Sequence, residues 1–159
     1  MITYIALGTN LGDRSENLAR ARKLLAEHVR IVKSSSIYET TPWGVADQPL
    51  FLNQVIEGET ELTALELLRF LKQIEQEMGR KESFRFGPRL IDLDVLLYGE
   101  LQMQTPELTI PHIRMTQRAF VLVPLVEIAP HLDIPGTGMK LEEALASLDI
   151  TSVRRLEGS

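Results

Sequence analysis

The chain has 159 residues and a mass of 18.0 kDa, a size that suits one domain. Its composition, 44% hydrophobic and 25% charged, is ordinary for a soluble globular protein, and a net charge of -5 argues against general affinity for nucleic acid or anionic membranes. Zero cysteines exclude disulfides and thiolate metal sites, and neither an export signal nor an apolar run of about 20 residues is present. We expect one cytoplasmic domain over residues 1–159, acting as a monomer without nucleic-acid or membrane partners.

The beginning of the chain predicts a strand, a helix and a second strand. Residues 2–7 are a short apolar strand, and a glycine-rich turn over residues 8–13 leads into a helix with one apolar face between Leu18 and Val29. Asp13 or Asn10 is placed to cap this helix. The turn lacks the lysine and the glycine spacing of a Walker loop or a dinucleotide fingerprint, so alone it is only a tight turn. Residues 31–38 predict the second strand.

A long loop over residues 39–49 follows, with two prolines and the only tryptophan, and such loops are often functional in a compact domain. Residues 51–57 predict a third strand that carries Phe51, Asn53, Val55 and Glu57 on one face. An aromatic ring beside an asparagine can hold a flat, hydrogen-bonding heterocycle. The alternative is that Phe51 is a core residue and Asn53 a turn residue at the strand end.

The next helix opens at Thr63, with Glu66 placed for a capping box, and runs to Gly79. Its apolar stripe indicates core packing, and Glu75 is the exception on that stripe; a solvated charge is one explanation. Residues 80–89 are basic, aromatic and without periodicity, which predicts a loop that carries phosphate ligands. A solvated basic turn is the alternative.

Apolar residues and aspartates alternate from residue 91 to residue 97, between Gly87 and Gly99, as in a strand bounded by turns. Asp92 and Asp94 therefore share one face, while Ile91, Leu93, Val95 and Leu97 point the other way. Two neighbouring carboxylates on a half-buried sheet repel unless a cation lies between them, and magnesium suits a site that also holds phosphates. The alternative is a plain polar pair on a wet strand face.

Arg89 lies three residues before Asp92, where it can reach phosphate oxygens held at the carboxylates. The string Phe-Gly-Pro-Arg-Leu-Ile-Asp-Leu-Asp-Val-Leu, residues 86–96, closely resembles the signature of the 6-hydroxymethyl-7,8-dihydropterin pyrophosphokinases. These enzymes of folate biosynthesis transfer a pyrophosphoryl group from ATP to a pterin alcohol. The resemblance extends to the turn at residues 8–12 and the Thr-x-Pro-His run at residues 109–112, and it covers the chain to about residue 130.

The resemblance implies a role for each matching residue. It implies two magnesium ions on Asp92 and Asp94, with ATP as co-substrate, and it implies that Arg80, Arg89, Asp92 and Asp94 are catalytic. The implied pterin-binding residues are Thr40, Pro42, Trp43, Phe51, Asn53 and Phe120. The implied ATP-binding residues are Glu75, Arg80, Phe86, Arg89, Val95, Thr109, His112 and Arg118.

The last part of the chain predicts a return strand over residues 101–103, an amphipathic helix over residues 118–128 and a short helix over residues 142–148. The order strand, helix, strand, strand, helix, strand predicts an α+β, ferredoxin-like βαββαβ core with a mainly antiparallel sheet, helices on one face and a C-terminal extension. A fold does not choose a function. A metal-dependent phosphoesterase could use Asp92 and Asp94 without ATP, and a noncatalytic ligand-binding or RNA-binding module could share this fold. The acidic net charge argues against RNA binding.

Overall fold

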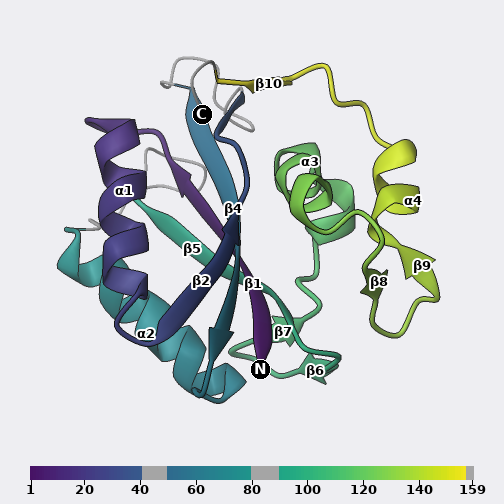
Figure 1. The fold of residues 1–159 in the computed structure, drawn as a ribbon, viewed down its shortest axis with the longest axis horizontal. Coiled ribbons are helices and arrows are strands. Elements are labelled where there is room, and N and C mark those ends of the chain that lie inside the picture. Colours follow the sequence, from purple (N-terminus) through teal and green to yellow (C-terminus); the bar gives the residue numbers. More distant parts are fainter. Residues whose placement is uncertain (41–49, 80–89, 157–159) are drawn as a thin grey trace.

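The computed structural model of the protein describes residues 1–40, 50–79 and 90–156. The first half contains β1 (Ile2–Thr9), α1 (Arg14–Leu25), β2 (Val29–Ser34), β3 (Tyr38–Thr40), β4 (Phe51–Thr60) and α2 (Ala64–Glu77). The second half contains β5 (Asp92–Tyr98), β6 (Met103–Gln104), β7 (Thr109–Ile110), the 3-10 helix η1 (Met115–Gln117), α3 (Ala119–Ile128), β8 (Asp133–Ile134), β9 (Met139–Lys140), α4 (Leu141–Ala146) and β10 (Val153–Arg155). Figure 1 shows the main sheet between α1 and α2 on one side and α3 and α4 on the other.

The main sheet is antiparallel, in the order β10-β3-β4-β1-β5, and β2 pairs with the far half of β4. With β2 and β3 taken together as the second strand, this is the order of a ferredoxin-like sheet, which confirms the predicted fold class. The prediction of one strand over residues 31–38 was wrong. The chain leaves the ladder at Ser35, whose backbone N–H donates to the Val55 carbonyl and whose hydroxyl accepts from the Val55 N–H, and pairing resumes at β3.

The helices α1 and α2 cover one face of the sheet and bury the larger core cluster. Asp13, not Asn10, caps α1: its carboxylate accepts a hydrogen bond from the Glu16 N–H. The predicted capping box at Thr63 and Glu66 is present at the start of α2. These caps satisfy N–H groups that the first turn of a helix leaves without partners inside the helix.

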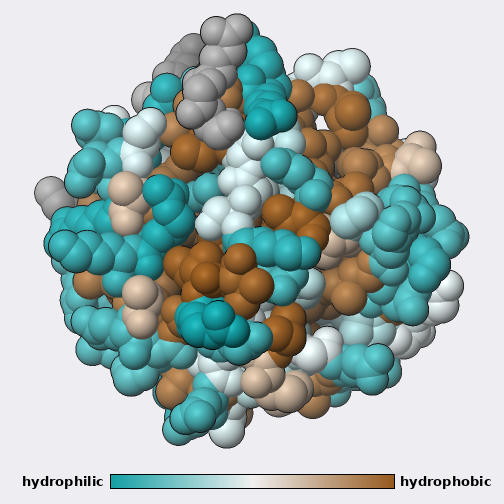
Figure 2. All heavy atoms as spheres, in the orientation of Figure 1, coloured by the Kyte–Doolittle hydropathy of each residue, from teal (hydrophilic) through white to brown (hydrophobic). Residues whose placement is uncertain are grey.

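The opposite face of the sheet is covered by α3, from the C-terminal extension, and α4 packs beside it. The prediction of helices on one face therefore holds for the two helices of the βαββαβ core, and the extension adds a second layer. Phe120, Val126 and Ile128 of α3 pack against this second core while only partly buried. Figure 2 shows apolar atoms gathered over α3, between the more hydrophilic surfaces of α1 and α4.

The pairing of β5 with β1 is irregular near its end. Val95 pairs with Ile5 and Leu97 with Tyr4, so Leu96 is an extra residue on β5, as in a β-bulge. The bulge breaks the two-residue alternation, and Leu97 packs in the α3 core instead of with Leu93 and Val95. The predicted face of Leu97 was wrong for this reason. No helix in residues 1–40, 50–79 and 90–156 is long and apolar enough to cross a membrane.

Candidate active site

Asp92 and Asp94 project from β5 toward the α3 side of the sheet. Ile91, Leu93 and Val95, which alternate with them, are buried in the core beneath α1 and α2. Asp92 is half-buried and Asp94 is exposed. The predicted carboxylate pair on one strand face is therefore present, on the side that α3 partly covers.

The strand register places these carboxylates in a row with the predicted pterin residues. Gly8 of β1 pairs with Asp92 on one side and with Asn53 of β4 on the other, and Asn53 pairs with Tyr38 of β3. Paired residues share a sheet face, so all four positions look toward α3. Adjacent strands lie about 4.8 Å apart, which puts β4 and β5 roughly 10 Å apart with β1 between them.

Gly8, in the middle of this row, has no side chain above the sheet. A Cβ atom at Gly8 would lie 3.2 Å from Nδ2 of Asn53 and 3.9 Å from Cδ1 of Phe51. Ala6, the next β1 residue on the same face, pairs with Asp94 and is also small. The β1 strand therefore leaves space above the sheet between the carboxylates and the Phe51–Asn53 pair. The sequence interpretation missed this role and treated Gly8 only as part of a tight turn; its period-two relation to Ala6 was the available signal.

Thr40 and Asn53 are hydrogen-bonded to each other. The Thr40 hydroxyl donates to Asn53 Oδ1 at 2.7 Å, and both side chains are buried. Thr40 pairs with Phe51, a half-buried ring on the same face as Asn53. The alternative in which Phe51 is a core residue and Asn53 a turn residue is wrong, because Phe51 belongs to neither buried cluster and Asn53 lies within β4.

Another aromatic residue of the candidate site comes from α3. Phe120 lies in its first turn and is half-buried, and the Arg118 guanidinium lies over its ring with 5.6 Å between Cζ and the ring centroid. A cation at this distance is attracted by the negative face of the ring. This contact uses one face of Phe120, so a stacked ligand would take the other.

Basic groups surround the carboxylates from the segment before α3. Burial lowers the pKa of His112, with the negative charge of Asp94 acting in the opposite direction and the positive charges of Arg118 and Arg114 acting in the same direction. Burial also lowers the pKa of Arg118, and the charges of Asp94 and Asp92 oppose that shift. These mutual effects indicate that His112 and Arg118 lie near the aspartates and that Arg114 lies near His112 and Arg118. The sequence analysis did not single out Arg114; its position four residues before Arg118 was the available signal.

Glu75 reaches β5 from the other side of the sheet. Its side chain is buried, and its carboxylate accepts a 2.9 Å hydrogen bond from the N–H of Leu93, the residue between the two aspartates. The interpretation of Glu75 as a solvated charge was therefore wrong. Val95 is buried too, with its side chain in the core. Backbone groups two residues apart on a strand point to the same edge, so those of Val95 point to the edge that the Leu93 N–H faces.

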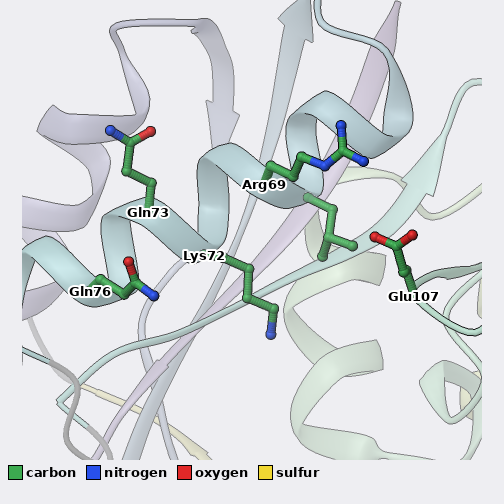
Figure 3. Close-up of a pocket in the computed structure, with 6 residues that line it drawn as sticks. Arg69, Lys72, Gln73, Gln76 and Glu107 are labelled. Atoms are coloured by element: carbon green, nitrogen blue, oxygen red, sulfur yellow. The ribbon is translucent and has the colours of Figure 1, made fainter.

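A pocket of about 370 Å³ lies between α2 and the segment that precedes β7. Arg69, Lys72, Gln73 and Gln76 extend from α2, and Glu107 points back toward that helix (Figure 3). The pocket lies next to two predicted ATP-binding residues in sequence: Gln76 follows Glu75, and Glu107 precedes the half-buried Thr109 by two residues.

The carboxylates of Asp92 and Asp94 suit magnesium better than a metal ion whose ligands all come from the protein. In the described part of the chain, no group of three His, Asp or Glu side chains stands ready to hold a metal ion. Magnesium binds through one or two carboxylates and takes its other ligands from water and substrate phosphates. Asp92 and Asp94 on one open face meet that requirement. Five predicted site residues, Pro42, Trp43, Arg80, Phe86 and Arg89, lie outside the described residues.

Comparison with known proteins gives one consistent result. Residues 4–130 match the family model for 7,8-dihydro-6-hydroxymethylpterin-pyrophosphokinase (HPPK). The chain is 46% identical over 144 residues to the 2-amino-4-hydroxy-6-hydroxymethyldihydropteridine pyrophosphokinase of Bacillus subtilis, covering 89% of this chain and 86% of that one. It is 46% identical over 156 residues to the protein of the same name from Methylorubrum extorquens, covering 97% and 98% of the two chains.

Solved structures show the same fold. A crystal structure of HPPK-DHPS in complex with substrates matches 98% of this chain with a TM-score of 0.79 at 15% identity, and this chain covers 46% of its length. Wild-type Plasmodium falciparum HPPK-DHPS matches 97% of this chain with a TM-score of 0.71, also at 15% identity, and this chain covers 47% of it. The chain thus spans about half of these solved proteins and nearly all of its bacterial relatives. The family-model match over residues 4–130 and the identity to the two bacterial relatives show that the chain belongs to the 7,8-dihydro-6-hydroxymethylpterin-pyrophosphokinase family.

Proposed function

We propose that this chain transfers the pyrophosphoryl group of ATP to the hydroxymethyl group of 6-hydroxymethyl-7,8-dihydropterin, in line and with two magnesium ions on Asp92 and Asp94. Family membership makes the chain an ATP-dependent pyrophosphokinase of folate synthesis. The products are AMP and the pterin diphosphate. Beyond this activity, we propose the two-magnesium arrangement and the roles of the individual residues.

The row of residues across the sheet is the observation that carries the proposal. Asn53 and Asp92 flank the same glycine, Gly8, on neighbouring strands. A ring held at Phe51 and Asn53 would therefore have its hydroxymethyl arm directed over β1 toward the carboxylates. Holding two reactants in this way converts binding energy into orientation, which supplies a large part of the rate enhancement in bimolecular transfers.

At the pterin end, Asn53 would recognise the polar edge of the ring. Its side chain is anchored, because Oδ1 already accepts the Thr40 hydroxyl. Phe51 and the free face of Phe120 would stack on the two faces of the ring. Pro42 and Trp43 complete the pterin pocket in this proposal through their backbone.

At the nucleotide end, cationic and polar groups would hold the triphosphate beside β5. Arg118 and His112 approach the aspartates, and Arg114 adds a further positive charge near both. Arg80 and Arg89 are the catalytic arginines of this proposal, with Phe86 between them, because a guanidinium binds phosphate oxygens in pairs and keeps its charge. Thr109, the backbone of Val95 and the pocket beside α2 would take the adenosine part of ATP.

The reaction forms a bond between the pterin hydroxymethyl oxygen and the β-phosphorus of ATP and breaks the bridging bond between the α- and β-phosphates. The bridging oxygen and its electron pair leave with AMP. Magnesium, when bound, neutralises phosphate charge and favours the alkoxide form of the attacking hydroxyl. The proton of that hydroxyl would pass to a carboxylate at the Asp92–Asp94 pair, which lies on the open face of the sheet.

Product analysis tests this function. The purified protein is incubated with ATP, magnesium and the reduced pterin, and AMP and pterin diphosphate are quantified together. Equal amounts of both, formed only when all three components are present, are expected. Release of inorganic phosphate without pterin would indicate a phosphoesterase, and the absence of turnover with intact ligand binding would indicate a binding module; either result contradicts the proposal.

A further inference from the structure

We propose that Glu75 is a positioning residue, which holds the β5 peptide between Asp92 and Asp94 from the outer edge of the sheet and thereby sets the direction of both carboxylates. This inference rests on the proposed metal-binding function of the two aspartates. It gives Glu75 a task on the protein itself, whereas the family resemblance implies a contact with ATP.

The burial of Glu75 is the first observation. Its side chain is only 4% exposed and lies on α2 beside Ile74 and Leu71, which belong to the core. A buried carboxylate is costly unless hydrogen bonds or charges compensate it. Lys72 approaches to 4.0 Å, but its side chain is 60% exposed, so that ion pair is weak. The Leu93 N–H is a buried partner with good geometry, at 2.9 Å.

The place of Leu93 in the sheet is the second observation. β5 is the end strand of the described sheet, and the strand beside it in that sheet is β1. In an antiparallel ladder, alternate residues direct their backbone groups to opposite sides. Because the Leu93 N–H points to Glu75, the backbone groups of Asp92 and Asp94 point to β1, where they pair with Gly8 and Ala6. The peptide units on either side of Leu93 are therefore held by β1 on one side and by Glu75 on the other.

A strand edge without such a partner twists more easily, and a twist at Leu93 would turn the side chains of Asp92 and Asp94 relative to each other. Groups that orient metal ligands without touching the metal typically change metal affinity by about 10–100-fold when removed. Glu75 acts through the backbone of Leu93, so its effect should fall on Asp92 and Asp94 together. The acceptor oxygen carries this role, and a glutamine side chain also provides one.

The test compares Glu75→Gln, which keeps an acceptor, with Glu75→Leu, which removes it at similar size. Glu77→Leu is the matched control, because Glu77 is exposed on the same helix. The probe is Mn²⁺ in the presence of a nonhydrolysable ATP analogue, with the Mn²⁺ dissociation constant measured by paramagnetic resonance. Hydrogen exchange of the Leu93 amide is measured in the free protein, and thermal unfolding verifies that each variant is folded.

Glu75→Leu should weaken Mn²⁺ binding by about tenfold or more and accelerate exchange of the Leu93 amide, while Glu75→Gln and Glu77→Leu stay within about threefold of the wild type. A folded Glu75→Leu protein with wild-type Mn²⁺ affinity would overturn the inference. So would a Glu75→Gln protein as impaired as Glu75→Leu, because the charge and not the acceptor would then matter. Asp92→Asn separates a failure of this inference from a failure of the proposed function. If that variant binds Mn²⁺ normally, the metal site itself is misassigned, whatever Glu75 does.

Discussion

The hydroxyl of Thr40 donates a 2.7 Å hydrogen bond to the side-chain oxygen of Asn53, across the pairing of β3 with β4. An asparagine amide presents an oxygen at one end and an NH₂ group at the other, and rotation by half a turn exchanges them. In the structure the Thr40 hydroxyl engages the oxygen end of the amide and anchors the side chain. A ligand that approaches Asn53 would meet a side chain that is already ordered before binding, which lowers the entropic cost of recognition.

Thr40→Val should therefore weaken pterin binding by about 0.5–1.5 kcal/mol, the usual cost of ordering one side chain on binding. Valine has nearly the shape of threonine, so the strand should keep its packing. ATP affinity should stay within about twofold, because two strands, β4 and β1, lie between Thr40 and β5. Isothermal titration with each ligand measures both effects.

Thr60→Val is the matched control for this substitution. Thr60 is as buried as Thr40, at 4% exposure, and its hydroxyl donates to the His28 carbonyl at the opposite end of β4. It should lose a similar stability without any loss of pterin affinity. If both valine variants weaken pterin binding equally, the effect is a general loss of sheet stability and the Thr40 assignment fails.

Removing either aromatic ring should weaken the binding of the pterin and leave the binding of ATP unchanged. Phe51→Ala and Phe120→Ala are each expected to weaken pterin binding by about 1–3 kcal/mol, through lost apolar burial and lost stacking. Both rings are half-buried in the free protein, so part of each ring surface is available to a ligand. Calorimetric titrations with pterin and with an ATP analogue provide the comparison. Equal weakening of both ligands, or unfolding of the variants, would contradict the stacking model.

Asp92→Asn and Asp94→Asn should each lower turnover by orders of magnitude while the fold survives, because asparagine keeps the size but removes the charge that holds a divalent cation. Steady-state AMP release at saturating magnesium is the measurement. Asp133→Asn serves as the control: Asp133 is an exposed strand aspartate whose carboxylate pairs with Lys140 at 2.9 Å, in the C-terminal extension. Near-normal turnover of either β5 variant would rule out the two-magnesium assignment.

Local periodicity was enough to predict the central feature of the site. Asp92 and Asp94 share a face because a strand repeats every two residues, and this needs no knowledge of the rest of the fold. Leu97 shows where that reasoning ends. Its side chain changes face because of the bulge at Leu96, and the bulge depends on how β5 pairs with Tyr4 and Ile5, about 90 residues earlier in the chain.

Long-range contacts also explain the other differences. The break between β2 and β3 is set by hydrogen bonds of Ser35 with Val55, 20 residues away, which no local pattern in residues 31–38 reveals. Glu75 did carry a local signal, since helical spacing puts it on the buried stripe of α2. Whether a charge on such a stripe is buried depends on its partner, and the Leu93 amide is 18 residues away.

A last relationship ties α3 to the strand that carries Thr40. The Glu127 carboxylate accepts hydrogen bonds from the Tyr38 hydroxyl at 2.7 Å, from the Ser36 hydroxyl at 2.8 Å and from the Ser36 N–H at 3.0 Å. Partial burial acts to raise the pKa of Glu127, but these hydrogen bonds outweigh it and hold the pKa below the ordinary value of 4.5. Burial and the same carboxylate raise the pKa of Tyr38 to about 12, so the phenol stays protonated and continues to donate.

Glu127→Gln should therefore destabilise the protein in a pH-dependent way. A carboxyl whose pKa is lower in the folded state than in the unfolded chain stabilises the fold above the unfolded-state value of 4.5, and it loses this contribution as the pH falls through the folded-state pKa. At pH 7 the free energy of unfolding of the wild type should exceed that of Glu127→Gln by about 1 kcal/mol or less, because Glu127 is exposed, and this difference should shrink below pH 4.5. Urea unfolding at pH 7, 5, 4 and 3 measures it, with Glu143→Gln, an exposed site on α4, as the reference. A stability difference that stays constant from pH 7 to pH 3 would show that the charge of Glu127 has no part in holding β3 against α3.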